Sequence, residues 1–215
     1  YDRVTAYLKE GYSAAGLGSS RTTSRQRAVG FVMATFQKMI SSSPRAIKQA
    51  LRRRLLASYA RKQLGLESGH AGRITDSNVA TKSAWYQEQM RKLTAEILSY
   101  EKGKIDSIEA DSYILKVKQR LSKRPNYSQE VTSWALDAIE DSETAIEAEA
   151  NIPDEEKKLQ ELIELVEDAP DRKLQTLVRA IEQLRKENPK EKMIIFTQYR
   201  ETLFFLRDEL AKYYG

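Results

Sequence analysis

Three consecutive arginines, Arg52, Arg53 and Arg54, form the densest group of side chains in the sequence that could bind an anion. Guanidinium groups bind phosphate oxygens through paired hydrogen bonds, so such a group is typical of contact with a nucleic-acid backbone. On a helix, however, three consecutive residues point in different directions and cannot all face one ligand. Two interpretations remain open: at least one arginine contacts DNA, or all three form salt bridges to acidic helices.

The charge distribution along the chain leaves the same two possibilities. The net charge is only +5, but residues 1–65 contain 13 Lys and Arg against 2 Asp and Glu, whereas residues 130–170 contain 2 against 14. A basic segment of this density attracts a phosphate backbone, because each neutralised phosphate releases a condensed counterion. Alternatively, the acidic helices fold back over the basic ones. The sequence does not decide between these arrangements.

Several kinds of chemistry are not indicated by the sequence. The chain has no cysteine, which excludes a disulfide framework, a thiolate metal site and a cysteine nucleophile. His70, the only histidine, has no neighbouring carboxylate or second histidine, so we expect it to be exposed and without a catalytic role. No phosphate-binding G-x-x-x-x-G-K-[ST] loop, Asp-Glu pair after an apolar strand or late arginine motif is present. We therefore expect no complete ATPase site, and no cofactor or metal bound by this chain itself.

No apolar run approaches the roughly 20 residues that cross a bilayer, so no membrane role is indicated. The absence of cysteine fits a cytoplasmic location. The two tryptophans, Trp85 and Trp134, are expected to pack between helices, not to stack on bases.

The hydrophobic pattern repeats with helical period along most of the chain and predicts a mainly α-helical fold. Ser43 followed by Pro44 is a favourable helix start, and Asp171 is a candidate cap after Pro170. A loop is expected around Gly16 and Gly18, and a flexible segment over residues 65–78. The expected helices lie near residues 1–12, 29–40, 44–59, 86–100, 105–122, 129–149, 154–166, 171–188 and 203–210.

One stretch departs from this pattern. Residues 192–197 form a continuous apolar run bounded by polar residues, which predicts a strand buried on both faces of a parallel sheet, and a helix follows. Such a strand needs neighbours on both edges, yet no second convincing strand is present. We therefore expect the chain to be a truncated piece of a longer protein, or to pair with a strand supplied in trans.

Two groups of residues carry a more specific pattern. The C-terminal group is Asp171-x-Lys173, Leu174, Leu177 and Ile181, followed by the continuous stretch from Met193 to Leu203. The N-terminal group is Tyr1-Asp2-x-Val4-Thr5, Ala28 to Met33, Ser42-Ser43-Pro44-x-Ala46-Ile47, and Leu51 to Arg54. In this order the two groups resemble Swi/Snf-type superfamily 2 helicase-like ATPases, in particular the bacterial helicase-like group. The resemblance covers roughly residues 1–56 and 165–215.

The resemblance implies a parent protein that hydrolyses ATP with Mg²⁺ between two RecA-like domains and moves along, or remodels complexes on, duplex DNA. Within it, residues 1–65 would be a basic helical region after the first motor domain, 66–169 a helical insertion, and 170–215 the truncated start of the second RecA-like domain. The chain would then be an interdomain spacer. A non-enzymatic helical scaffold that binds protein partners is the alternative.

The resemblance also suggests a nucleic-acid contact at residues 197–200, because helicase motif IV lies near the nucleic-acid backbone. The candidates are Thr197, Gln198, Tyr199 and Arg200, and the hydroxyl, amide and guanidinium groups among them suit phosphate oxygens. The alternative is that Thr197 only caps the following helix and Arg200 is solvated.

Overall fold

The computed structural model describes residues 2–14, 24–69, 77–122, 152–167 and 171–214 of the 215-residue chain. The regular structure within these ranges is helical, so the prediction of a mainly α fold is confirmed. The helices are α1 (Asp2–Ala14), α2 (Ser24–Ser42), α3 (Pro44–Gly69), α4 (Ser77–Lys102), α5 (Ser107–Ser122), α7 (Glu155–Glu167), α8 (Arg172–Glu187) and α9 (Arg200–Tyr214).

Two helices begin where local sequence signals predict. The backbone N–H of Ala46 donates to Ser43 Oγ at 3.1 Å, so Ser43 caps α3 and Pro44 occupies the first helical position. At α8 the backbone N–H of Leu174 donates to Asp171 Oδ1 at 2.9 Å. Both predicted caps are confirmed. They were predictable from the sequence because each cap requires only a side chain three residues before its backbone partner.

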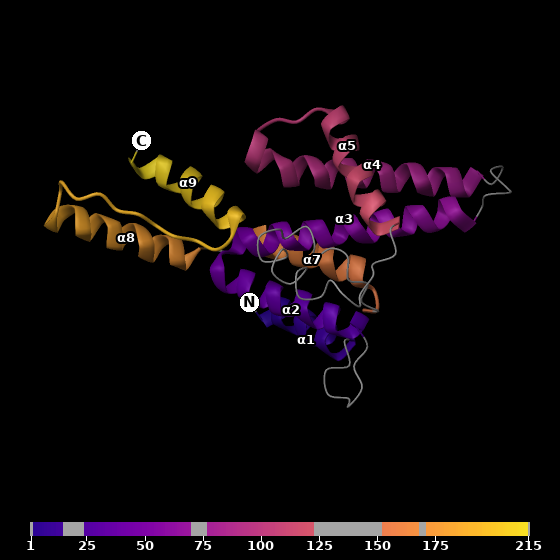
Figure 1. Ribbon diagram of the computed structural model, residues 1–215, viewed down its shortest axis with the longest axis horizontal. Helices are drawn as coiled ribbons and strands as arrows, with labels where there is room; N and C mark the ends of the chain where they lie inside the picture. Colours follow the sequence, from indigo (N-terminus) through magenta and orange to yellow (C-terminus); the bar gives the residue numbers. More distant parts are fainter. Residues whose placement is uncertain (1, 15–23, 70–76, 123–151, 168–170, 215) are drawn as a thin grey trace.

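Helix α3 is the centre of the fold. It packs against α2, α4, α5, α7 and α9, and Figure 1 shows α4 and α5 on one side of it and α7 with α1 and α2 on the other. Its 26 residues span about 39 Å at the usual helical rise. Between residues 46 and 60 almost every side chain is buried, polar ones included. A helix covered on all sides must find buried partners for its polar residues.

Helices α3 and α4 lie antiparallel along most of their length. The Nε2 atom of Gln63, late in α3, donates to Ser83 Oγ, early in α4, at 3.0 Å. Tyr59 of α3 meets Trp85 and Tyr86 of α4, with its ring centroid 5.6 Å from each. Trp85 therefore packs between helices, as predicted, although about half of its surface is exposed.

The prediction of a flexible segment over residues 65–78 is wrong at both ends. Helix α3 continues through Gly65 to Gly69, and α4 begins at Ser77. The helix continues because Gly65 is exposed and meets no obstacle, and because Glu67 pairs with Lys118 of α5 at 3.4 Å. His70 and Gly72 lie outside the described residues, as do the expected loop around Gly16 and Gly18 and the predicted helix at 129–149 with Trp134.

Helices α8 and α9 and the segment between them project from the body as an arm (Figure 1). In the described part of the chain, residues 192–198 form neither helix nor strand, so the predicted strand stays a prediction. Their apolar side chains are largely uncovered: Ile194 is 78% exposed and Phe196 90%. The arm is joined to the body mainly through α9 and α3.

We predict that Gly11→Ala destabilises the protein, because α1 and α2 pack closely at this residue. A Cβ added at Gly11 would lie 2.4 Å from Sδ and 2.8 Å from Cγ of Met33, which is itself fully buried. Overpacking of this kind costs about 1–3 kcal/mol. The measurement is the free energy of unfolding from chemical denaturation.

Gly65→Ala provides the matched control, since it makes the same substitution within a helix. An added Cβ at Gly65 meets nothing within 4 Å, so the variant should gain roughly 0.5–1 kcal/mol from better helix propensity. If the two substitutions change the free energy of unfolding by the same amount, the close packing of α1 against α2 at Gly11 is contradicted.

Candidate functional site

The three consecutive arginines of α3 reach three different helices. Successive residues of a helix are about 100° apart around its axis, so neighbours along the chain face different partners. The ion pairs are Arg52 Nη2 to Glu96 Oε2 of α4 at 2.7 Å, Arg53 Nη1 to Glu201 Oε1 of α9 at 2.5 Å, and Arg54 Nε to Glu155 Oε1 of α7 at 2.9 Å. We refer to Arg52–Arg54 as the arginine turn.

The arginine turn is buried. The side chains of Arg52, Arg53 and Arg54 are 5%, 6% and 1% exposed, respectively. Buried guanidinium groups require carboxylate partners, because a lone charge inside a protein is costly. The described residues thus match the salt-bridge interpretation of these arginines. Contact with a DNA phosphate would require an ion pair to open.

Tyr7 of α1 extends the contact between Arg54 and Glu155. Its hydroxyl donates to Glu155 Oε1 at 2.8 Å, the same oxygen that accepts from Arg54 Nε. Burial is the main cause that raises the pKa of the Tyr7 phenol above its ordinary value; Glu155 raises it further, and Arg54 acts in the opposite direction. Tyr7 therefore stays protonated and links α1 to both α3 and α7.

The first turn of α9 lies on the corner between α2 and α3. Thr202 Oγ1 is 3.1 Å from Ser42 Oγ and 3.2 Å from Ser43 Oγ. Ser43 is also the residue that caps α3. The hydroxyl group of Thr202 thus contacts the point where the chain turns from α2 into α3, beside the ion pair between Arg53 and Glu201.

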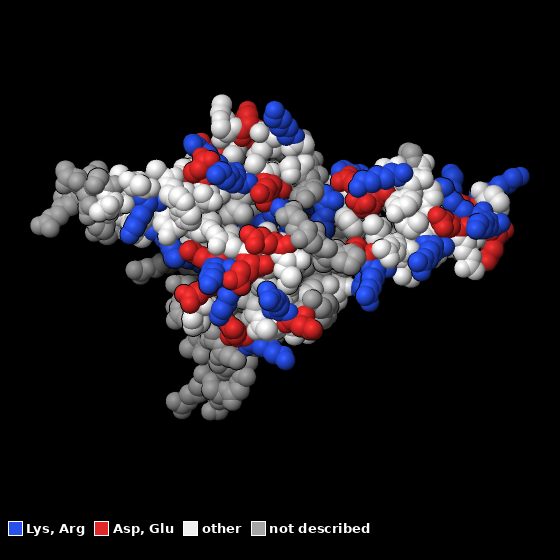
Figure 2. Space-filling view, turned by 180° about the vertical axis from the view of Figure 1, so that it is seen from behind, with Lys and Arg blue, Asp and Glu red and all other residues white. Residues whose placement is uncertain are grey.

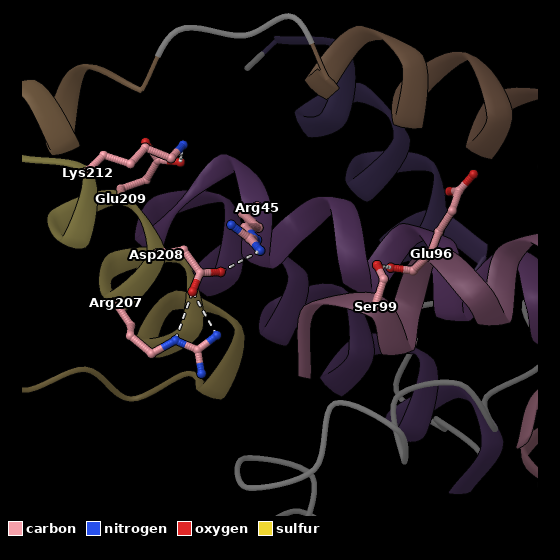
Figure 3. Close-up of polar contacts among 7 residues, drawn as sticks. All are labelled: Arg45, Glu96, Ser99, Arg207, Asp208, Glu209 and Lys212. Atoms are coloured by element: carbon pink, nitrogen blue, oxygen red, sulfur yellow. Dashed lines mark hydrogen bonds and ion pairs between the residues drawn. The ribbon is translucent and has the colours of Figure 1, made fainter. Parts of the chain in front are cut away.

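A second charged contact lies farther along α9 (Figure 3). Asp208 accepts from Arg45 Nη2 of α3 at 3.4 Å and from Arg207 Nε of its own helix at 2.8 Å. The Arg45 guanidinium also lies 5.6 Å from the centroid of the Phe205 ring. Residues 201, 205 and 208 follow helical spacing and residue 202 adjoins them, so one face of α9 is attached to α3 and to the corner between α2 and α3.

The four residues predicted from helicase motif IV have different environments. Gln198 and Arg200 are exposed, Thr197 is partly buried, and Tyr199 is only 6% exposed within the hydrophobic core. Burial raises the pKa of the Tyr199 phenol. Helix α9 begins at Arg200, so Tyr199, not Thr197, directly precedes it. Gln198 and Arg200 remain the side chains that a ligand could reach.

The fold brings the two predicted groups together through Glu201, which lies in the quoted stretch from Met193 to Leu203 but was not predicted as a site residue. It pairs with Arg53 across 148 positions of sequence. Thr202, in the same stretch, and Asp208 were not predicted as site residues either. Asp208 follows Glu201 at the helical spacing of seven positions, but nothing in the sequence identified α3 as the helix that these residues face.

The acidic helix α7 folds back over the basic helix α3. Glu156 accepts hydrogen bonds from Ser58 Oγ and from Lys62 Nζ, both at 2.8 Å. The folding-back interpretation of the charge pattern is therefore supported for α7, whereas residues 130–151 lie outside the described residues. Figure 2 shows basic and acidic side chains interspersed over one face of the molecule, without a continuous basic surface.

Within the described ranges no group of three or more His, Cys, Asp or Glu residues is placed to hold a metal ion. Among the same residues no helix is both long and apolar enough to cross a bilayer.

Comparisons of the chain with protein-family models, with curated proteins and with solved structures find no significant match. The resemblance to Swi/Snf-type ATPases therefore stays a prediction that depends on the residues quoted above. The geometry adds the junction of α9 with α2 and α3, which places the motif-like segment on the helical body.

Tyr7→Phe should change how stability depends on pH at the alkaline end. The pKa of Tyr7 is raised in the folded state, so its contribution to stability is fully present below the unfolded pKa of about 10 and is lost as the pH rises further. At pH 7 the variant should be less stable by about 1 kcal/mol, since the hydrogen bond to Glu155 is lost. Above pH 10 the difference in stability between wild type and Tyr7→Phe should become smaller.

The measurement is the urea midpoint of both proteins between pH 7 and pH 11. Tyr213→Phe serves as the control, because Tyr213 is 55% exposed on α9. If the difference in urea midpoint between wild type and Tyr7→Phe stays constant up to pH 11, the buried, protonated state of Tyr7 is contradicted.

Proposed function

We propose that this chain is the helical spacer of a DNA-dependent ATPase of the Swi/Snf type, which remodels protein–DNA complexes. In this proposal α1–α7 form the interdomain region, and α8, residues 192–198 and α9 begin the second RecA-like domain. ATP and Mg²⁺ would be bound by other parts of the parent protein, since no complete nucleotide site is present in this sequence. The partner of the spacer would be duplex DNA, alone or within a DNA-bound complex.

The attachment of α9 is the observation that best supports this proposal. A buried ion pair from Arg53 to Glu201 and the hydroxyl contacts of Thr202 hold the first turn of α9 against the helical body. The polar residues around the start of α9 are positioned as a result. Gln198 and Arg200 lie at the surface, where amide and guanidinium groups can donate hydrogen bonds to phosphate oxygens.

The exposed apolar segment at residues 192–197 supports the proposal that the part of the chain from α8 through α9 is the start of an α/β domain. Ile194 and Phe196 are two residues apart and mostly exposed, while Met193 and Ile195, which alternate with them, are 39% and 38% exposed. In an extended chain these pairs lie on opposite faces, so both faces are apolar. This pattern suits a strand inside a parallel sheet, and we propose that residues 192–197 form one when neighbouring strands are present.

A helical scaffold for protein partners is the second candidate function. Ile108 and Leu115 of α5 are 77% and 55% exposed, and seven residues separate them, so they lie on one face of the helix. Two exposed apolar side chains on one face of a helix can contact another protein.

Gln198→Ala with Arg200→Ala should weaken binding to a labelled DNA duplex, measured by fluorescence anisotropy over a series of salt concentrations. Wild type should show a steep loss of affinity with salt, because bound phosphates release counterions. Removing the Arg200 charge should lower the salt slope by about 1.

Lys82→Ala is the matched control, since it also removes one positive charge. Lys82 is exposed on α4 and makes no ion pair among the described residues. It should leave both affinity and salt slope close to wild type. Two results would rule out a phosphate contact at this site and favour the scaffold function. One is duplex binding that does not depend on salt. The other is an equal loss of duplex affinity in Lys82→Ala and in the double variant of Gln198 and Arg200.

A further inference from the structure

The arginine turn places three interhelical ion pairs on consecutive residues of one helix. Arg53 faces α9 and Arg54 faces α7, and through Glu155 the latter contact also includes Tyr7 of α1. Consecutive residues of a helix share its rigid backbone, so a rotation or shift of α3 that follows one partner moves both guanidinium groups. Glu201 and Glu155 do not need to touch for their positions to be linked.

We propose that the arginine turn couples the C-terminal helix α9 to α7 and to the N-terminal helix α1. When Glu201 moves away, Arg53 stays buried but loses its ion pair to α9. The body responds with a shift of α3, which loosens the contact of Arg54 with Glu155 and Tyr7. The coupling needs only these contacts, so it goes beyond the proposed spacer function; in that function it would connect the ends of the two motor domains.

Burial determines which pairs are coupled strongly. Glu201 is 10% exposed and Glu155 12% exposed, so neither carboxylate can easily exchange its arginine for water. Glu96, the partner of Arg52, is 50% exposed and can be solvated when the pair opens. Coupling should therefore be strong between α9 and α7 and weak towards α4. This difference is specific to the arginine turn and would not follow from general loosening of the fold.

The test is hydrogen exchange of the whole chain, followed by mass spectrometry of peptides from each helix. Glu201→Gln should speed exchange several-fold in the first turn of α9 and also in α7 and α1, while α5 is unchanged. Glu155→Gln should speed exchange in α7, α1 and α9, because coupling between two sites is reciprocal. Glu96→Gln should affect α4 alone.

Thr202→Val is the matched control on α9. It removes the hydroxyl contacts with Ser42 and Ser43 but leaves the ion pair of Glu201, so exchange should rise in α9 without any change in α7. Should Glu201→Gln unfold the chain, Glu201→Asp decides the question, because it keeps the charge and shortens the reach to Arg53; exchange should then rise moderately in both α9 and α7.

The coupling would be overturned if Glu201→Gln, or Glu201→Asp in its place, speeds exchange in α9 alone. It would also be overturned if the effects of that variant and of Glu155→Gln on the urea midpoint add independently in the double variant. Non-additive effects are expected for residues that act through one shared element.

Discussion

The fold depends on one constraint: a guanidinium group buried inside a helical bundle must have a carboxylate within reach. Helix α3 is covered on nearly all sides between residues 46 and 60, and the arginine turn lies in the middle of that stretch. Because its three side chains point in three directions, α4, α7 and α9 must each supply a glutamate at a matching height. The arrangement of these helices around α3 satisfies this requirement.

The arginine turn selects an arrangement more than it adds stability. Removing two charges from water costs several kcal/mol for each ion, and their attraction repays this cost only where the geometry is good. Arg52 shows the cost: its Nε and Nη1 atoms are buried without a hydrogen-bond partner in the described part of the chain. The side-chain amide of Gln49, one turn earlier, likewise has both its Nε2 and Oε1 atoms buried without a hydrogen-bond partner among the described residues. The apolar residues of α3 supply burial energy, while the arginines specify which helix lies on which face.

The same constraint explains why the arm is joined to the body at the start of α9. Glu201, Thr202 and Asp208 lie on the face of α9 that meets α3, and the hydroxyl and charged contacts there require close approach. To the other residues that the structure describes, residues 192–198 make no such contacts, and their apolar side chains stay exposed. The arm is thus attached to the body through α9, while the apolar side chains of residues 192–198 stay uncovered. Such an arrangement fits the boundary between a spacer and a further domain, and this supports the proposed spacer function.

Local signals in the sequence determined the helices, whereas the tertiary structure decided their partners. Ser43 and Asp171 were predictable as caps, because each bonds to a backbone N–H only three residues away. The loop predicted from residue 65 failed because Gly65 is tolerated in an exposed helical turn. The burial of Tyr199 and the pairing of Arg53 with Glu201 across 148 positions could not be predicted, since electrostatic attraction depends on distance in space and the sequence specifies only order along the chain.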